Sequence, residues 1–154
     1  MKHAKKACVI AFTLYNFIIA NNIQQQRVIA EISYGELIDK ITILKIKSER
    51  IADPVKLINI LTELTSLLKT LVAQVEPCAD ITHLMQELKQ VNEALWDVED
   101  ALRIKEKIKD FGDDFIQLAR SVYITNDQRF VLKKRVDALL GSPISEEKSY
   151  ESYT

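Results

Sequence analysis

The chain has 154 residues, of which 47% are hydrophobic and 28% are charged, a length and composition typical of one globular domain and not of a disordered chain. The formal net charge is −1, which argues against binding to nucleic acid or to an anionic membrane, because both need a basic surplus. Only three glycines and three prolines are present, so helices are favoured over a turn-rich β fold.

Residues 1–26 differ from the rest of the chain. Three lysines and His3 precede an apolar run over residues 7–20, which matches a secretory signal and is short for a membrane span. The cleavage pattern is poor, because Ile18 stands where a small residue is expected if Ala20 were the last one removed. Three interpretations stay open: an export signal or membrane anchor, a helix packed on the domain, or an extension outside the working protein. Any membrane contact would come through residues 1–20; otherwise the expected location is cytoplasmic.

The first predicted elements are a short strand and a helix. Residues 28–32 alternate apolar and polar side chains, as one short strand would. Ser33 and Glu36 form a capping box, so a helix should begin at Tyr34 or at the residue after it. This helix is apolar on two sides and should be contacted from both, and Lys45 lies inside its main apolar arc.

Two further helices carry heptad seams. Asp53 is the predicted N-cap of the first and Pro54 its first residue, and residues 76–80 separate it from the second, which Asp80 or Thr82 would cap. Because the seams match in length, they predict a coiled-coil-like antiparallel hairpin. The seams are Leu57, Leu61, Leu64, Leu68, Leu71 and Val75, followed by Leu84, Leu88, Val91, Leu95, Val98 and Leu102.

A fourth helix should run from Asp113, or the residue after it, to Leu140. Gly112 is the predicted C-cap of the preceding helix, and Gly141 ends the fourth. The middle of the fourth helix's apolar stripe is polar, so residues 125–127 could hold a kink or a break. The sequence therefore predicts an all-α fold: a compact bundle of about four helices with one long antiparallel hairpin.

Several catalytic and metal-binding motifs are absent from the sequence. There is no glycine-rich phosphate loop and no GxSxG motif, and two histidines and two cysteines provide neither a nucleophile–His–Asp set nor a zinc site. We therefore expect no metal and no cofactor. An acid–base enzyme built on Glu, Asp, Lys and Arg is still compatible with the sequence, although these absences argue against catalysis.

Charged side chains also lie on helix faces that are predicted to be buried. An unpaired buried charge is costly, so these groups should pair with one another or face a water-filled cavity. One interpretation is a pocket between helices that binds a carboxylate or phosphate, with Glu99 balancing the charge or acting in acid–base chemistry. The other, which is favoured, is a set of interhelical salt bridges without a ligand. The residues concerned are Lys45, Trp96, Glu99, Arg103 and Arg129.

Four phrases of the sequence carry a resemblance to a known family: GELIDKITILKIKSERI, LWDVEDALRIKE, FIQLARSVYITNDQR and EEKSY. In them the chain resembles a small bacterial family known as a domain of unknown function. The resemblance implies one domain over residues 27–154, with residues 1–26 as an addition to it, which weakens the case for export. It brings no established activity, and it adds Asn126 to the candidate ligand-binding residues.

The C-terminal tail carries the last of these phrases. Its residues alone are compatible with a docking motif, with a strand that folds back over the bundle, or with a frayed end. The resemblance implies that the tail belongs to the domain, so four of its residues are candidate interaction residues: Glu146, Glu147, Lys148 and Tyr150.

The favoured function is a non-catalytic helical module that binds another protein or a second copy of itself, because excess apolar helix surface needs a partner. The alternative is a small all-α enzyme or anion-binding protein that uses the pocket of Lys, Arg and Glu side chains described above. That alternative is an analogy with chorismate-mutase-like bundles and rests on architecture alone.

Overall fold

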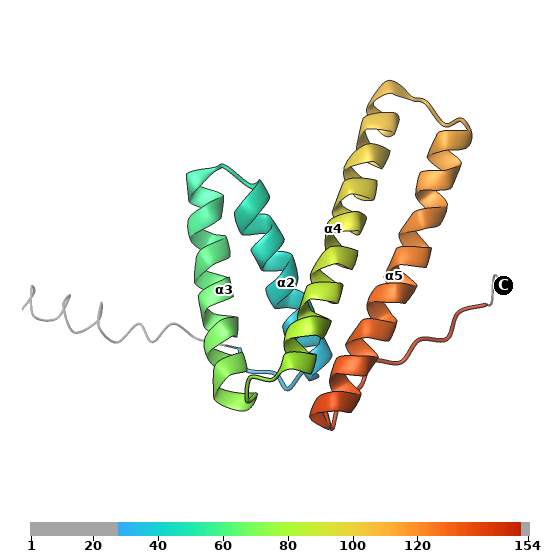
Figure 1. Cartoon of the computed structure of the whole chain (residues 1–154). Coiled ribbons are helices and arrows are strands. Elements are labelled where there is room, and N and C mark those ends of the chain that lie inside the picture. Colours follow the sequence, from blue (N-terminus) through green and yellow to red (C-terminus); the bar gives the residue numbers. More distant parts are fainter. Residues whose placement is uncertain (1–27, 152–154) are drawn as a thin grey trace, which may run out of the picture. The chain divides into compact units, whose positions relative to one another are not determined.

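The computed structural model describes residues 28–151, which contain four helices and no strand (Figure 1). Helix α2 spans Tyr34–Arg50, α3 spans Pro54–Gln74, α4 spans Ala79–Ile108 and α5 spans Asp113–Leu140. The predicted all-α bundle is confirmed. Residues 28–32 do not form the short strand, because nothing in the described part of the chain offers them a second strand to pair with. The three interpretations of residues 1–26 fall outside the described residues.

Local capping interactions place most of the helix ends where the sequence predicts them. The Ser33 hydroxyl accepts a hydrogen bond of 3.1 Å from the Glu36 backbone N–H at the start of α2. The Asp53 carboxylate accepts from two backbone N–H groups at the start of α3, with Pro54 as the first helical residue. Gly141 ends α5 in the left-handed conformation, with φ of 62°, which glycine adopts without strain.

Both ends of α4 differ from the prediction. The helix begins at Ala79, after an N-cap at Cys78 that makes no side-chain hydrogen bond, and not after Asp80 or Thr82. Its last residue is Ile108, and its C-cap is Lys109, which takes the left-handed conformation with φ of 58°, so Gly112 is not its C-cap. Gly112 instead precedes the first residue of α5. Helix α5 continues through residues 125–127 without a break.

Helix α2 is the centre of the packing. It contacts α3, α4 and α5, and α4 packs along α5, so α2–α3 and α4–α5 form two antiparallel hairpins (Figure 1). This confirms that the first helix is contacted from more than one side. The predicted pairing of the two leucine-rich seams is wrong, since α3 packs against α2 and does not pack directly against α4. Because α2 carries apolar residues on two sides, it can lie between α3 and α4.

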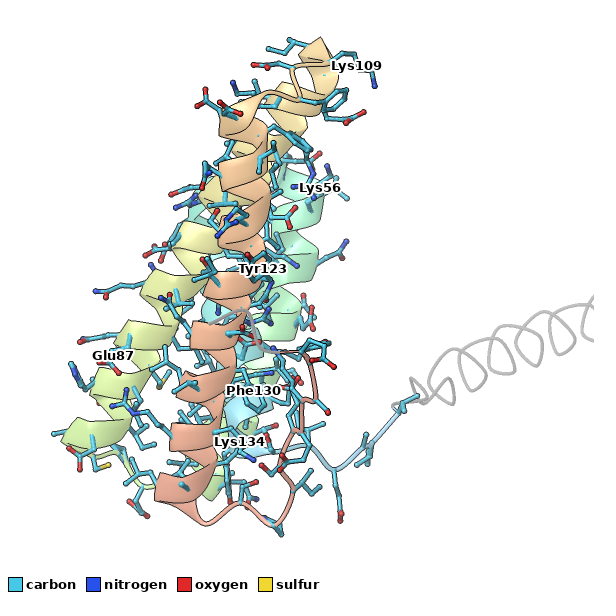
Figure 2. All side chains as sticks on the ribbon, turned by 90° about the vertical axis from the view of Figure 1, so that its right-hand side faces the viewer. Lys56, Glu87, Lys109, Tyr123, Phe130 and Lys134 are labelled. Atoms are coloured by element: carbon cyan, nitrogen blue, oxygen red, sulfur yellow. The ribbon has the colours of Figure 1, made fainter. Side chains whose placement is uncertain are left out.

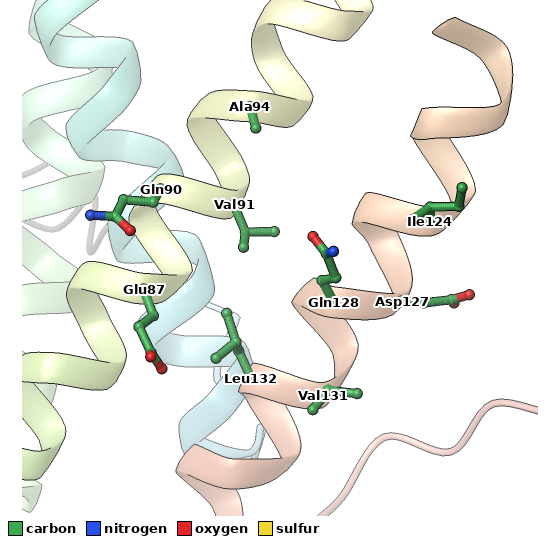
Figure 3. Close-up of a pocket in the computed structure, with 9 residues that line it drawn as sticks. All are labelled: Glu87, Gln90, Val91, Ala94, Ile124, Asp127, Gln128, Val131 and Leu132. Atoms are coloured by element: carbon green, nitrogen blue, oxygen red, sulfur yellow. The ribbon is translucent and has the colours of Figure 1, made fainter. Parts of the chain in front are cut away.

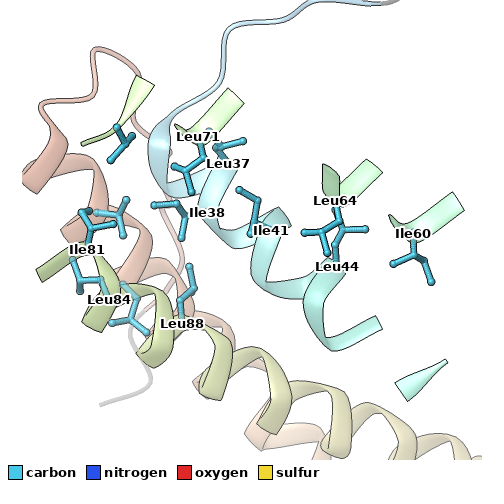
Figure 4. Close-up of a cluster of buried hydrophobic side chains, with 13 residues drawn as sticks. Leu37, Ile38, Ile41, Leu44, Ile60, Leu64, Leu71, Ile81, Leu84 and Leu88 are labelled. Atoms are coloured by element: carbon cyan, nitrogen blue, oxygen red, sulfur yellow. The ribbon is translucent and has the colours of Figure 1, made fainter. Parts of the chain in front are cut away.

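The core lies where α2 meets the other helices (Figure 4). Ile38, Ile41 and Leu88 have no exposed surface. Apolar side chains from all four helices join them in one cluster, which explains how a bundle with a central helix buries enough apolar surface to be stable. The other members are Leu37, Leu44, Ile60, Leu64, Leu71, Val75, Ile81, Leu84, Leu132 and Val136.

Helices α4 and α5 extend beyond the ends of α2 and α3 (Figure 1). In this extension the rings of Phe111 and Phe115 pack edge to face, with 5.2 Å between centroids. The extension leaves a step beside the C-terminal end of α2 (Figure 1). Within residues 28–151, no helix has both the length and the apolar character that a membrane span requires.

Candidate functional site

A buried carboxylate lies at the junction of α2, α4 and α5. Asp39 is only 1% exposed, and it lies on α2 beside the equally buried Thr42. Arg129 of α5 binds it through two guanidinium nitrogens: Nε donates to Oδ1 at 2.9 Å, and Nη2 donates to Oδ2. This two-point contact is a strong charge-assisted geometry. The hydrogen bonds to Asp39 raise the pKa of the Arg129 guanidinium above its ordinary value, against the opposing effect of burial.

Helix α4 contributes an amide to the same network. Asn92 Nδ2 donates to Asp39 Oδ1 at 2.9 Å and to the Thr42 hydroxyl at 3.0 Å. The Thr42 hydroxyl donates in turn to the Asp39 backbone carbonyl at 2.8 Å. These hydrogen bonds and the Asp39–Arg129 ion pair join three helices in one register. Asp39 and Asn92 were not predicted as site residues, although their polarity on core-facing positions was a visible signal.

A groove of about 430 Å³ lies beside this network and is called the Trp96 groove below. It brings together four of the predicted ligand-binding residues, namely Trp96, Glu99, Arg103 and Arg129. Arg103 and Glu99 form an ion pair at 2.9 Å along α4, and the Trp96 ring nitrogen donates to Asp100 at 2.8 Å. The complete lining is Ile43, Asn92, Leu95, Trp96, Glu99, Asp100, Arg103 and Arg129.

Two predicted residues lie outside the Trp96 groove. Lys45 is half-buried and makes no ion pair within residues 28–151. It points about 120° around α2 from Asp39, and α2 contributes Ile43 to the groove instead. Asn126 is adjacent, since its side-chain oxygen accepts a hydrogen bond of 3.3 Å from Arg129 Nη1. Asn126 lines a different hollow, together with Lys148 and Tyr150 of the tail.

The C-terminal tail folds back onto α5, as Figure 2 shows beside Phe130 and Lys134. Lys148 lies over the rings of Phe130 and Tyr150, at 5.0 and 5.9 Å from their centroids, within cation–π range. Its ammonium group also donates to the Asn126 backbone carbonyl at 3.3 Å, and Glu147 pairs with Lys134 at 2.7 Å. Of the three interpretations of the tail, a frayed end is therefore wrong for the described residues.

One ion pair between the tail and the bundle is buried. The Lys133 side chain is 9% exposed and binds the carboxylates of Glu36 in α2 and Glu146 in the tail. Burial alone would lower the pKa of the Lys133 ammonium group, but the contacts with Glu146 and Glu36 outweigh it and raise that pKa. Lys133 therefore stays charged at neutral pH and fixes the tail against both helices.

Replacing Glu146 with glutamine is expected to lower the free energy of unfolding by about 1–3 kcal/mol, because the buried Lys133 loses one of two charged partners. It should also speed proteolytic cleavage near the C-terminus. Urea denaturation and limited proteolysis measure these effects. Glu147→Gln is the matched control, since Glu147 is 78% exposed and its ion pair is worth at most about 1 kcal/mol. Equal losses in the two variants would contradict the buried role of Glu146.

A separate hollow of about 690 Å³ lies between α4 and α5 (Figure 3). Val91 and Leu132 face each other across it, with Gln128 at its edge. None of its lining residues belongs to the Asp39 network. Within residues 28–151 no three His, Cys, Asp or Glu side chains gather as a metal site requires. Of the three hollows described here within residues 28–151, the Trp96 groove is the one lined by Asn92 and Arg129 of the buried polar network.

Comparison with known proteins gives a family without an assigned activity. No curated protein and no solved structure matches the chain. A family model described as "Family of unknown function (DUF6165)" matches residues 28–154. This confirms the resemblance to a domain of unknown function, and the matched region includes the EEKSY tail. The chain therefore belongs to this family of unknown function.

Proposed function

We propose that this protein is a non-catalytic helical module that binds a helix of another polypeptide along α3. The observation that carries the proposal is the amount of apolar surface that α3 leaves uncovered. Ile58, Leu61 and Val72 are 66%, 45% and 78% exposed. Because α3 packs against α2 and against no other helix of the described chain, a second side of α3 is free for a partner.

The uncovered residues of α3 have the spacing of a helix-packing seam. Residues 60, 64, 67 and 71 face α2 and the core. A second row has alternating spacings of three and four, the pattern of a heptad seam. Its members are Ile58, Leu61, Thr65 and Val72, which are exposed, and Leu68, which is half-buried against the core. We call this row the α3 stripe. It lies about 110° around the helix from the first row and is about 21 Å long. Such a row matches the apolar side of a partner helix.

The charges around the α3 stripe also suit an apolar partner. Between residues 58 and 72 the charged side chains are Glu63 and Lys69, and Glu63 pairs with Lys40 of α2 at 3.1 Å. Four of the other exposed side chains in this range carry an uncharged hydroxyl group, namely Thr62, Thr65, Ser66 and Thr70. Contiguous apolar surface on an otherwise polar helix is typical of a protein-binding surface.

The cations of the Trp96 groove give less support to the alternative function, an anion-binding protein or enzyme. Arg129 is matched by Asp39, and Arg103 is matched by Glu99. A cation that already has a carboxylate partner attracts a second anion weakly. Lys45, which lacks such a partner within residues 28–151, does not line the groove. The pair of Arg129 with Asp39 joins α5 to α2, and such a fixed helix arrangement suits a binding module.

Site-specific photo-crosslinking in the native cell tests the proposal. The full chain would carry a photoreactive benzophenone amino acid at Ile58 or Val72 of the α3 stripe. We expect the same defined adduct from both positions. Its mass distinguishes the two kinds of partner, because a second copy doubles the mass of the chain and another protein gives a different increment.

The opposite side of α3 provides matched controls. Asn59 and Thr70 are exposed and lie roughly 150° from the α3 stripe, so the same amino acid at these positions should give no adduct. Adding Leu61→Glu should reduce the adduct from Val72 at least about tenfold, because a charge in the centre of an apolar contact is costly. No adduct, or equal adducts from both sides of the helix, would contradict the proposal.

A further inference from the structure

The Trp96 groove takes no part in the binding surface proposed on α3, because none of its lining residues lies on α3. Its lining comes from α2, α4 and α5. We infer that it binds a small, neutral, planar molecule that carries a hydrogen-bond donor next to an acceptor, as a primary carboxamide does. This site is separate from the α3 stripe, and it stands on different observations.

The floor of the Trp96 groove offers a fixed acceptor. Asn92 is 5% exposed, and its amide orientation is determined, because the Asp39 carboxylate can accept only from Nδ2. Nδ2 uses both hydrogens, on Asp39 and Thr42. Oδ1 receives no hydrogen bond within residues 28–151, and it is not sealed inside the protein. Asn92 lines the groove, so Oδ1 can accept from a ligand there.

The same floor offers a donor. A guanidinium group has five N–H bonds, and Arg129 uses one on each of its three nitrogens, for Asp39 and Asn126. One N–H on Nη1 and one on Nη2 are left over. Arg129 lines the groove beside Asn92, and both side chains are held in place by the buried Asp39. A donor and an acceptor fixed next to each other recognise a group with the complementary pair.

The charges around the groove favour a neutral ligand. Asp39 neutralises Arg129, and Glu99 neutralises Arg103. An entering carboxylate would find no unmatched cation among the lining residues and would approach Glu99 and Asp100. An entering ammonium group would approach two arginines. A neutral molecule avoids both repulsions and loses less hydration on entry than an ion does.

The walls of the groove favour a flat, apolar body. The Trp96 ring is held by its hydrogen bond to Asp100 and by the Arg50 guanidinium, which lies 5.7 Å from the ring centroid. Ile43 and Leu95 add aliphatic surface. Aromatic ligands pack well against a fixed indole ring. The volume of about 430 Å³ is within the range of small-molecule sites.

Trp96 is the single tryptophan of the chain, so its fluorescence reports directly on the groove. The full chain would be titrated with benzamide and, separately, with benzoate, which has the same ring but carries a carboxylate. We expect a saturable change in Trp96 emission with benzamide and a Kd on the order of 1 mM, as suits a small fragment. Benzoate should bind at least about tenfold more weakly, because the groove has no free cation.

Two enlarged side chains locate the binding. Ile43→Phe should fill the Trp96 groove and abolish the response to benzamide. Val131→Phe adds the same ring to the separate hollow between α4 and α5 and should leave the response unchanged. Leu95→Phe is the second groove-filling variant, for use if circular dichroism shows that Ile43→Phe is unfolded. All variants are compared with the natural chain by circular dichroism.

Several results would overturn the inference. These are no saturable response to benzamide, benzoate binding as tightly as benzamide, or binding that survives both groove-filling variants. Tighter binding of benzoate would assign the groove to anions instead. The α3 stripe takes no part in this experiment, so its outcome is independent of the crosslinking from Ile58 and Val72.

Discussion

Replacing Arg129 with methionine is expected to lower the free energy of unfolding by about 3–5 kcal/mol, the usual cost of removing one partner from a buried ion pair. The carboxylate of Asp39 is 1% exposed and would keep only the amide of Asn92 as a side-chain donor. Methionine retains most of the aliphatic length of arginine, so the loss reports mainly on the charge. Urea denaturation followed by far-ultraviolet circular dichroism measures it.

Arg103→Met is the matched control for this experiment. Arg103 also pairs with a carboxylate, Glu99, but its side chain is 69% exposed, so its removal should cost at most about 1 kcal/mol. The double variant Asp39→Leu/Arg129→Met removes both buried charges and should recover part of the loss. If Arg129→Met costs no more than Arg103→Met, the Asp39 network does not hold the three helices together.

The sequence predicts those features of this fold that depend on neighbouring residues. Ser33, Asp53 and Gly141 act within one turn of their own helix ends, so each end is visible as a short pattern. The end of α4 shows the limit of such patterns. Lys109 turns the chain before Gly112 is reached, and the Lys105 ammonium group binds Asp110 in the turn at 2.6 Å. This end is thus made at a lysine, with a side-chain contact beside it, against the preference for glycine.

The pairing of the helices could not be predicted from spacing. The seams of α3 and α4 have the same heptad spacing, which shows that each helix needs a partner but does not identify it. In the structure α2 lies between them, because it is apolar on two sides. The candidate site has the same limit: Asp39 is separated from Asn92 by 53 positions and from Arg129 by 90. Only the helix arrangement brings these groups together.

The close approach of α2 to α5 depends on a glycine, and Gly35→Ala is expected to lower the free energy of unfolding by about 2 kcal/mol. A methyl group at Gly35 would lie 2.6 Å from the Lys133 backbone oxygen and 3.0 Å from the carbonyl carbon. Backbone atoms within a helix cannot move aside individually, so α2 would have to shift as a whole, at the usual cost of overpacking. The shift would also weaken the hydrogen bond of 2.7 Å from the Gly35 backbone N–H to the buried Asp137 carboxylate.

Gly112→Ala separates this steric effect from the general effect of replacing glycine. A methyl group there would meet only Asp110 Oδ1, at 3.4 Å, so the loss of stability should be at most about 1 kcal/mol, the cost of replacing glycine with alanine at an N-cap. Thermal and urea denaturation compare the two variants directly. Since alanine favours helices more than glycine does, any loss in Gly35→Ala must come from the contact with α5. A stability equal to that of Gly112→Ala would mean that the two helices do not approach each other as closely as their backbones indicate.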